Sequence, residues 1–157
     1  MDLKIIGKTV LVTGSTAGIG FAIAKSLAAE GAHVYLNGRT KPRVDAAMTA
    51  IRSNSTSGKV DGIVADFSTP GAAEIVIAKL PVVDVLVNNV GIFEPKPFAQ
   101  IPDADWYRFF EINVMSGGPA CAALSRRNAE EQLGTHYFHF ERVGSADPRG
   151  DGALRDD

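Results

Sequence analysis

A glycine-rich segment directly after a short apolar run is the feature that most limits what this chain can fold into. The apolar run covers residues 9–12 (TVLV), and the glycine-rich segment covers residues 13–20 (TGSTAGIG). An Ala-rich helical stretch follows over residues 21–30, and residues 33–36 have the pattern of a second strand. Strand, glycine-rich turn, helix and strand make a βαβ unit, whose turn is suited to the pyrophosphate of a dinucleotide.

The glycines of this segment are expected to have different tasks. Gly14 permits the tight turn, Gly18 lets the backbone approach the phosphates, and Gly20 lets the helix pack closely on the strand. The alternative is a tight turn that binds no ligand. Contacts with the cofactor are predicted for six residues: Gly14, Ser15, Thr16, Gly18, Ile19 and Gly20.

Strand and helix patterns alternate along the chain up to about Asn113. Strands are predicted over residues 9–13, 33–37, 60–65 and 82–87, and helices over residues 21–30, 40–52, 69–79 and 102–114. Thr40 and Thr69 are predicted to cap the second and third helices, each with a proline close behind. This alternation predicts an α/β fold with a parallel sheet covered by helices.

The composition limits the class of protein and the kinds of partner that this chain can have. A chain of 157 residues with 45% hydrophobic residues has room for one domain with one core. The net charge of -2 argues against partners such as nucleic acid or an anionic membrane. Cys121 is the one cysteine, and the three histidines do not predict a metal site. No run is long enough to span a bilayer, so we expect a cytoplasmic protein.

A second signature lies at the end of the fourth predicted strand. Residues 88–91 read NNVG, and Asn113 follows within residues 110–114 (FEINV). With residues 13–20, these motifs resemble the short-chain dehydrogenase/reductase family, whose usual forms are TGxxxGIG, NNAG and a helix Asn. Val90 replaces the usual Ala. The resemblance covers residues 1–117 and implies a Rossmann-type doubly wound sheet of strand order 3-2-1-4 in proteins that are usually homo-oligomers.

The resemblance also implies site residues. Asp66 and Phe67 correspond to the pair that contacts adenine, although Asp66 is equally placed to cap its turn. Asn88 corresponds to the residue that ties the central strands together, Val90 and Gly91 to neighbours of the adenosine ribose, and Asn113 to the Asn of the catalytic relay.

Arg39 bears on which dinucleotide is bound. An NAD enzyme carries an acidic residue after the second strand for the ribose 2′-OH, and residues 37–40 (NGRT) have none. A guanidinium suits a 2′-phosphate, which favours NADP(H) over NAD(H). The alternative is that Arg39 is a solvated loop charge.

The family's proton-transfer residues are not matched. They are a Ser after strand five and a Tyr-x-x-x-Lys on the next helix, where the Tyr exchanges the hydroxyl proton and the Lys lowers its pKa. Tyr137 is followed four places later by Glu141, and Ser145 lies in a Gly/Pro/Asp run. We therefore expect residues 1–117 to form the NAD(P)-binding portion and residues 118–157 to be an irregular, non-native or disordered tail without a buried strand.

A one-base insertion near the codons of Gly117 and Gly118 is our hypothesis for this tail. Read one base later, the codons for residues 134–144 permit Gly-Arg-Ile-Ile-Phe-Ile-Ser-Ser-Glu-Ser, which is the family's fifth strand with its serine. The same frame through residue 157 permits a sequence ending His-Tyr-Gly-Met-Thr, followed by Lys if the stop codon is TAA. A gene sequence that cannot encode these elements in the neighbouring frame would remove the hypothesis.

The family implies hydride transfer between NAD(P) and a small ketone or secondary alcohol. Without the Ser, Tyr and Lys, we expect little or no turnover, and marginal folding because the fourth strand loses its neighbour. Two alternatives stay open. One is a non-catalytic dinucleotide-binding or oligomer-interaction module that joins an intact relative through the helix around Trp106. The other is a product without function.

Overall fold

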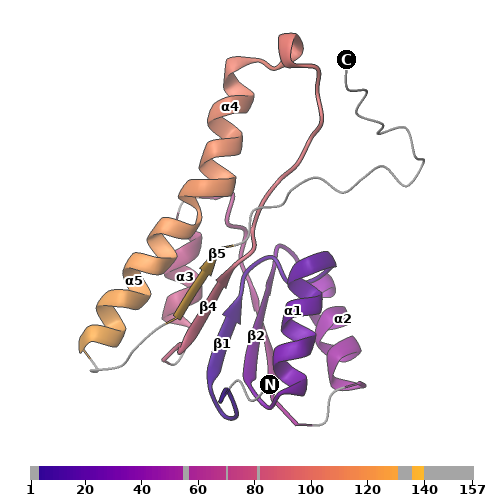
Figure 1. Cartoon of the computed structure of the whole chain (residues 1–157), viewed down its shortest axis with the longest axis vertical. Coiled ribbons are helices and arrows are strands. Elements are labelled where there is room, and N and C mark those ends of the chain that lie inside the picture. Colours follow the sequence, from indigo (N-terminus) through magenta and orange to yellow (C-terminus); the bar gives the residue numbers. More distant parts are fainter. Residues whose placement is uncertain (1–3, 55–56, 70, 81, 131–135, 140–157) are drawn as a thin grey trace, which may run out of the picture.

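Five parallel strands form a single sheet in the order β3-β2-β1-β4-β5 in the computed structural model of the chain (Figure 1). The structure describes residues 4–54, 57–69, 71–80, 82–130 and 136–139. The strands are β1 (Thr9–Val12), β2 (His33–Gly38), β3 (Val60–Val64), β4 (Val85–Asn88) and β5 (His136–His139). The predicted strand order 3-2-1-4 is therefore confirmed.

β1 lies in the interior of the sheet and is buried on both faces. It pairs with β2 from Thr9↔His33 onward and with β4 from Val10↔Val85 onward. Val10, Leu11 and Val12 are each 0% exposed. Because successive side chains of a strand point to opposite faces, Val10 and Val12 enter one core and Leu11 the other. The unbroken apolar run in the sequence follows from this burial.

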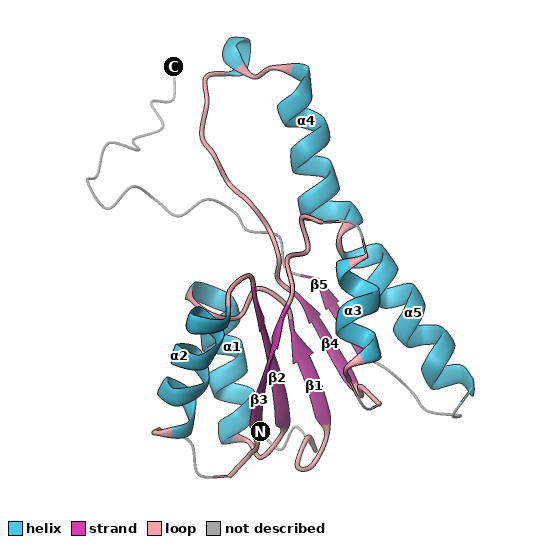
Figure 2. Cartoon of the chain, turned by 180° about the vertical axis from the view of Figure 1, so that it is seen from behind, coloured by secondary structure: helices cyan, strands magenta, loops and turns pink. Residues whose placement is uncertain are grey.

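The helices cover both faces of the sheet (Figure 2). One core is completed by Ala24 and Ala28 of α1 with Ile51 of α2, and the other by Val76 of α3 with Leu124 of α5. This two-layer cover is the doubly wound arrangement that the alternating pattern predicts. The helix bounds are α1 (Gly18–Ala29), α2 (Lys41–Arg52), α3 (Ala72–Ala78), α4 (Asp103–Phe110) and α5 (Gly117–Glu130).

The segment after β4 leaves the sheet and returns as α4. We call residues 91–110 the arm; it includes the short 3-10 helix η1 (Phe98–Gln100) and extends beyond the carboxyl ends of the strands (Figure 1). A π-helical turn, η2 (Glu111–Met115), connects α4 to α5. No residue of α4 is buried, and Trp106 is 53% exposed.

The expectation that the fourth strand loses its neighbour is wrong, and so is the expectation that the chain is irregular directly after residue 118. α5 continues to Glu130, with Ala120 and Leu124 1% and 0% exposed, and β5 pairs with β4 from Val85↔His136 to Asn88↔His139. The fourth strand therefore has neighbours on both sides. Residues 131–135 and 140–157, the remainder of the predicted tail, lie outside the described residues.

The starts of the third helix and the fourth strand also differ from the predicted ones. α3 begins at Ala72 after Gly71, whose φ is +80°, and the Thr69 hydroxyl instead donates to the Asp66 carbonyl at 2.7 Å. The fourth strand begins at Val85 rather than at residue 82. Just before it, the Asp84 carboxylate accepts hydrogen bonds from the Thr9 N–H at 2.8 Å and the Lys8 ammonium at 2.8 Å.

Candidate functional site

The carboxyl ends of β1 and β4 meet at the point where the winding of the sheet reverses. The chain passes from β1 through α1 to β2 on one side, and from β3 through α3 to β4 on the other (Figure 1). In open α/β sheets, ligands bind outside the carboxyl ends of the strands at such a switch point. The glycine-rich turn of residues 13–20 and the segment of residues 88–92 border this place.

Gly18 and Gly20 have opposite surroundings. A Cβ on Gly18, whose φ is +60°, would meet nothing within 4 Å. A Cβ on Gly20 would lie 2.3 Å from the Asn89 Nδ2 and 2.8 Å from the Gly14 carbonyl oxygen. The loop is thus open to a ligand at Gly18 and tightly packed at Gly20. The close packing at Gly20 is the packing expected of it, and the approach of a cofactor at Gly18 stays a prediction.

The N-terminus of α1 is open as well. The residue before the helix, Ala17, offers no side-chain cap, and the first turn contains no acidic residue. Ile19, in that turn, is 56% exposed. Free N–H groups and the positive end of the helix dipole suit an anionic group, so this turn fits a pyrophosphate.

Ser15 and Thr16 were both predicted to contact the cofactor, and their side chains lie within the loop packing. Ser15 is fully buried; its hydroxyl donates to the Val12 carbonyl at 2.7 Å and accepts from the Asn37 N–H at 2.9 Å. The Ser15 hydroxyl therefore joins β1 to β2 rather than facing solvent. Thr16 is half-buried above Gly38, where a Cβ would lie 2.4 Å from the Thr16 Cγ2.

Asn37 shapes the site without having been predicted as a site residue. Its Oδ1 accepts from the Gly14 N–H at 3.2 Å, and its Nδ2 donates to the carbonyls of Ile63 at 3.3 Å and Ala65 at 3.1 Å. One buried amide thus connects the glycine-rich loop to the ends of β2 and β3. The signal in the sequence is an Asn at the end of an otherwise apolar strand, where a buried polar group needs partners.

Asn89, not Asn88, ties the central strands together. The Asn89 Nδ2 donates to the carbonyls of Thr13 at 3.1 Å and Gly14 at 3.0 Å, and its backbone N–H donates to the Thr13 hydroxyl at 2.9 Å. The Asn88 side chain turns toward α5, where its Nδ2 donates to the Cys121 Sγ at 3.3 Å. The role predicted for Asn88 therefore belongs to its neighbour.

Asp66 adopts the turn-capping role that the sequence left open. Its Oδ1 accepts from the Ser68 N–H at 3.0 Å and the Ser68 hydroxyl at 2.7 Å. Burial works against ionisation, but these two hydrogen bonds and the charge of Arg39 together lower the pKa of Asp66. Arg39 itself is exposed just beyond β2, and Phe67 is half-buried against the core under α3.

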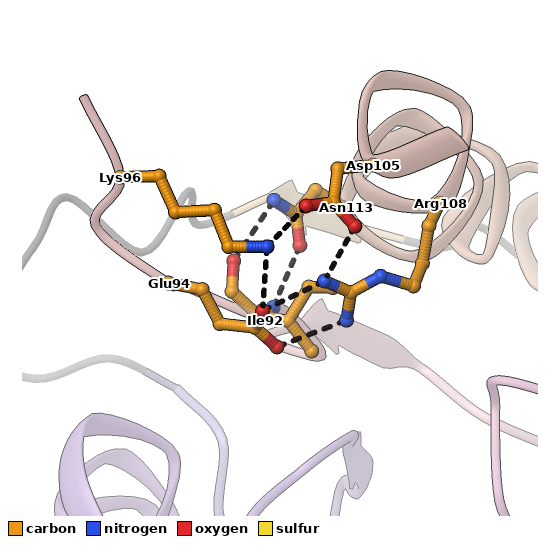
Figure 3. Close-up of polar contacts among 6 residues, drawn as sticks. All are labelled: Ile92, Glu94, Lys96, Asp105, Arg108 and Asn113. Atoms are coloured by element: carbon orange, nitrogen blue, oxygen red, sulfur yellow. Dashed lines mark hydrogen bonds and ion pairs between the residues drawn. The ribbon is translucent and has the colours of Figure 1, made fainter. Parts of the chain in front are cut away.

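Val90 and Gly91 are half-buried where the arm leaves β4. Asn113, within η2, holds the following residue: its Oδ1 accepts from the Ile92 N–H at 2.7 Å, and its Nδ2 donates to the Ile92 carbonyl at 3.1 Å (Figure 3). Single π-helical turns are frequent at functional sites. Asn113 thus fixes the first residues of the arm beside the switch point.

Tyr137 lies within β5, paired with Leu86, and not on a helix. Glu141 and Ser145 fall outside the described residues. Within the described ranges, no group of three or more His, Cys, Asp or Glu side chains could hold a metal ion. No helix in that part of the chain is long and apolar enough to cross a membrane.

Solved structures share this fold. L-sorbose reductase from Gluconobacter frateurii, solved with NADPH and L-sorbose, is 31% identical with a TM-score of 0.73, over 80% of this chain and 49% of that one. A bulky-bulky ketone specific alcohol dehydrogenase from Comamonas testosteroni is 28% identical with a TM-score of 0.70, over 81% of this chain and 52% of that one.

Curated proteins are also similar to this chain in sequence. The oxidoreductase YvaG of Bacillus subtilis, itself uncharacterised, is 46% identical over 117 residues, which cover 74% of this chain and 44% of that protein. The 5-keto-D-gluconate 5-reductase of Escherichia coli is 29% identical over 137 residues, 83% of this chain and 52% of that protein. This chain thus spans about half the length of such relatives. The family model for short chain dehydrogenase matches residues 8–135. The chain therefore belongs to the short-chain dehydrogenase family.

Proposed function

We propose that this chain holds NADP(H) at the switch point between β1 and β4. The observation that carries the proposal is the pairing of an open Gly18 with a closed Gly20 at the uncapped start of α1. The first turn of α1 binds the pyrophosphate, and the loops after β2 and β3 receive the adenosine end.

Arg39 is the reason for proposing NADP(H) rather than NAD(H) as the cofactor. It is exposed after β2, and residues 37–40 contain no carboxylate for a ribose 2′-OH. A guanidinium binds a 2′-phosphate through charge-assisted hydrogen bonds. The L-sorbose reductase was solved with NADPH, which agrees with this choice for a relative of the same fold.

The substrate class of the whole family protein is proposed to be a small ketone or secondary alcohol. The bound dinucleotide supplies or accepts the hydride. Two relatives are reductases of 5-keto-D-gluconate and L-sorbose. We further propose that residues 1–157 alone bind the dinucleotide with little or no turnover. Tyr137 is followed four places later by Glu141 where the family pattern has Lys, so the pair that would exchange the hydroxyl proton is not matched.

Titration with NADPH and with NADH, followed by nicotinamide fluorescence, tests the cofactor proposal. Wild type should bind NADPH more tightly than NADH, and Arg39→Ser should remove that preference. Arg126→Ser, at an exposed arginine of α5, is the matched control and should leave both affinities unchanged. Equal affinities in the wild type would contradict the preference, and no binding of either dinucleotide would contradict the function itself.

A second candidate is an interaction module that joins another copy or an intact relative. The observation in its favour is the exposure of Trp106, Tyr107 and Phe110 on α4, at 53%, 77% and 54%. Light scattering with and without an active relative distinguishes the two candidates. Complex formation that Trp106→Ser abolishes, in a chain that does not bind NADPH, would favour the module.

A further inference from the structure

Four charged side chains join the first part of the arm to α4, which forms its second part. Glu94 and Lys96 come from the segment that leaves β4, and Asp105 and Arg108 come from the facing helix (Figure 3). The guanidinium of Arg108 forms two parallel hydrogen bonds with Glu94, from Nη1 to Oε1 at 2.9 Å and from Nη2 to Oε2 at 2.8 Å. This bidentate geometry fixes the relative orientation of the two side chains as well as the distance between them. We call these four residues the arm cluster.

The remaining contacts close the arm cluster into a ring. Arg108 Nη2 also donates to Asp105 Oδ1 at 3.2 Å, and the Lys96 ammonium donates to Asp105 Oδ2. Lys96 Nζ lies 4.0 Å from Glu94 Oε2. Two acids and two bases thus neutralise one another, and each acid contacts both bases. Asp105, with its side chain 15% exposed, is the most sheltered member.

The arm cluster holds a segment that borders the dinucleotide site. Two residues before Glu94, Asn113 bonds both backbone groups of Ile92. Asn89, which packs against Gly20, begins the same segment. The chain from Asn89 to Lys96 is therefore fixed at three points. Its first point lies at the glycine-rich loop, and its last two lie beyond the carboxyl end of β4.

We propose that the arm cluster is a positioning device for the nicotinamide half of a bound dinucleotide. The inference rests on the proposed function. The glycine-rich loop and Arg39 hold the pyrophosphate and the adenosine end, and Val90 and Gly91 adjoin the adenosine ribose, so the half that remains extends along the chain beyond Gly91. α4 has no buried residue, and its ring contact with the start of the arm joins two exposed side chains, Phe98 and Trp106. The position of this segment therefore depends mainly on Asn113 and on the arm cluster.

A role in general stability is the competing explanation, and the energetics of such sites oppose it. The side chains of Glu94, Lys96 and Arg108 are 46%, 39% and 38% exposed. Partly exposed ion pairs contribute little to global stability because water screens them. They can still fix the local direction of a segment, especially through a two-pronged arginine contact.

The test compares two probes, NADPH and 2′,5′-ADP, which carries only the adenosine end. In Arg108→Gln, NADPH affinity should fall about fivefold while 2′,5′-ADP affinity stays unchanged. The exchange Glu94→Arg with Arg108→Glu keeps an opposite-charge pair and should restore part of the NADPH affinity. Arg126→Gln, an exposed arginine of α5, is the control, and far-UV circular dichroism verifies the fold of each variant.

Each other outcome decides against the proposal. If Arg108→Gln weakens both probes equally, the arm cluster supports the fold as a whole. If Arg108→Gln weakens neither probe while wild type binds both, the arm does not reach the nicotinamide half, and only the positioning role is refuted. If wild type itself binds neither NADPH nor 2′,5′-ADP, the proposed function is refuted.

Discussion

Gly20 has no space for even one methyl group. The substitution Gly20→Ala would place a Cβ 2.3 Å from the Asn89 Nδ2 and 2.8 Å from the Gly14 carbonyl. Relief requires moving the amide that ties β4 to the glycine-rich loop. We expect the free energy of unfolding to fall by about 1–3 kcal/mol and NADPH binding to weaken, measured by urea denaturation and by titration.

Gly118→Ala serves as the control because a Cβ there meets nothing within 4 Å. It should change stability by at most about 1 kcal/mol, and toward greater stability if helix propensity dominates. A Gly20→Ala protein as stable as this control would show that Asn89 moves aside without cost.

Sequence reasoning at the residue scale identified the glycines better than their polar supports. A glycine-rich turn after a strand has few structural uses, so its position was predictable. The partners of buried amides depend on which strand ends meet in space, and the printed order of residues does not contain that information. Asn37 and Asn89 were therefore missed, and Ser15 was predicted to contact the cofactor although its hydroxyl joins two strands.

α5 is the element in which the structure differs most from the sequence prediction. Leu124 is 0% exposed in the core beneath α3, in a stretch that was expected to be irregular. Leu124→Ala should lower the free energy of unfolding by about 2–5 kcal/mol, measured by urea denaturation. Ile75→Ala, at a side chain of α3 that is 51% exposed, should cost much less. Equal small effects would mean that α5 does not pack on the sheet.

The strand and helix periodicity up to residue 113 predicted four strands, most clearly β1 and β4, whose apolar runs reflect burial on two faces. The order of the strands was implied by the family resemblance. Beyond residue 118 the only β-branched side chains are those of Thr135 and Val143, too few to indicate a buried strand, so β5 could not be predicted. β5 pairs with β4 through backbone groups, which do not depend on the side chains, so this pairing gives no signal in the sequence. The shifted reading frame stays a prediction for sequencing to test.

The arm should respond to acid before the sheet does. Hydrogen bonds from Arg108 lower the pKa of Glu94, and those from Lys96 and Arg108 lower the pKa of Asp105. A lowered folded-state pKa means that the stabilisation is complete above the ordinary carboxyl range and is lost as pH falls through the lowered values, below about pH 4.

Trp106, the one tryptophan of the chain, lies on the arm and contacts Phe98 edge to face. Its emission should therefore shift in that acid range while the far-UV circular dichroism is still native. Arg108→Gln should abolish the separate step. If emission and circular dichroism change together in the wild type, the arm does not detach on its own.

At the scale of the whole molecule, a dinucleotide should act as a stabiliser. A ligand that binds only the folded state raises the free energy of unfolding by about 2.7 kcal/mol at a hundred times its dissociation constant. NADPH should raise the Tm more than NADH does, measured by calorimetry. A Tm that no dinucleotide changes would contradict the proposed function.

The order of strands also governs how the polypeptide is assembled on the ribosome. β1 is made early, yet its partner β4 begins at Val85, and the Thr9 N–H finds the Asp84 carboxylate 75 positions later. Until that stretch emerges from the exit tunnel, one flank of the interior strand is uncovered, and pairings between distant segments form slowly. A nascent chain of this design exposes that flank during synthesis, and slowing translation before Val85 is expected to prolong the exposure.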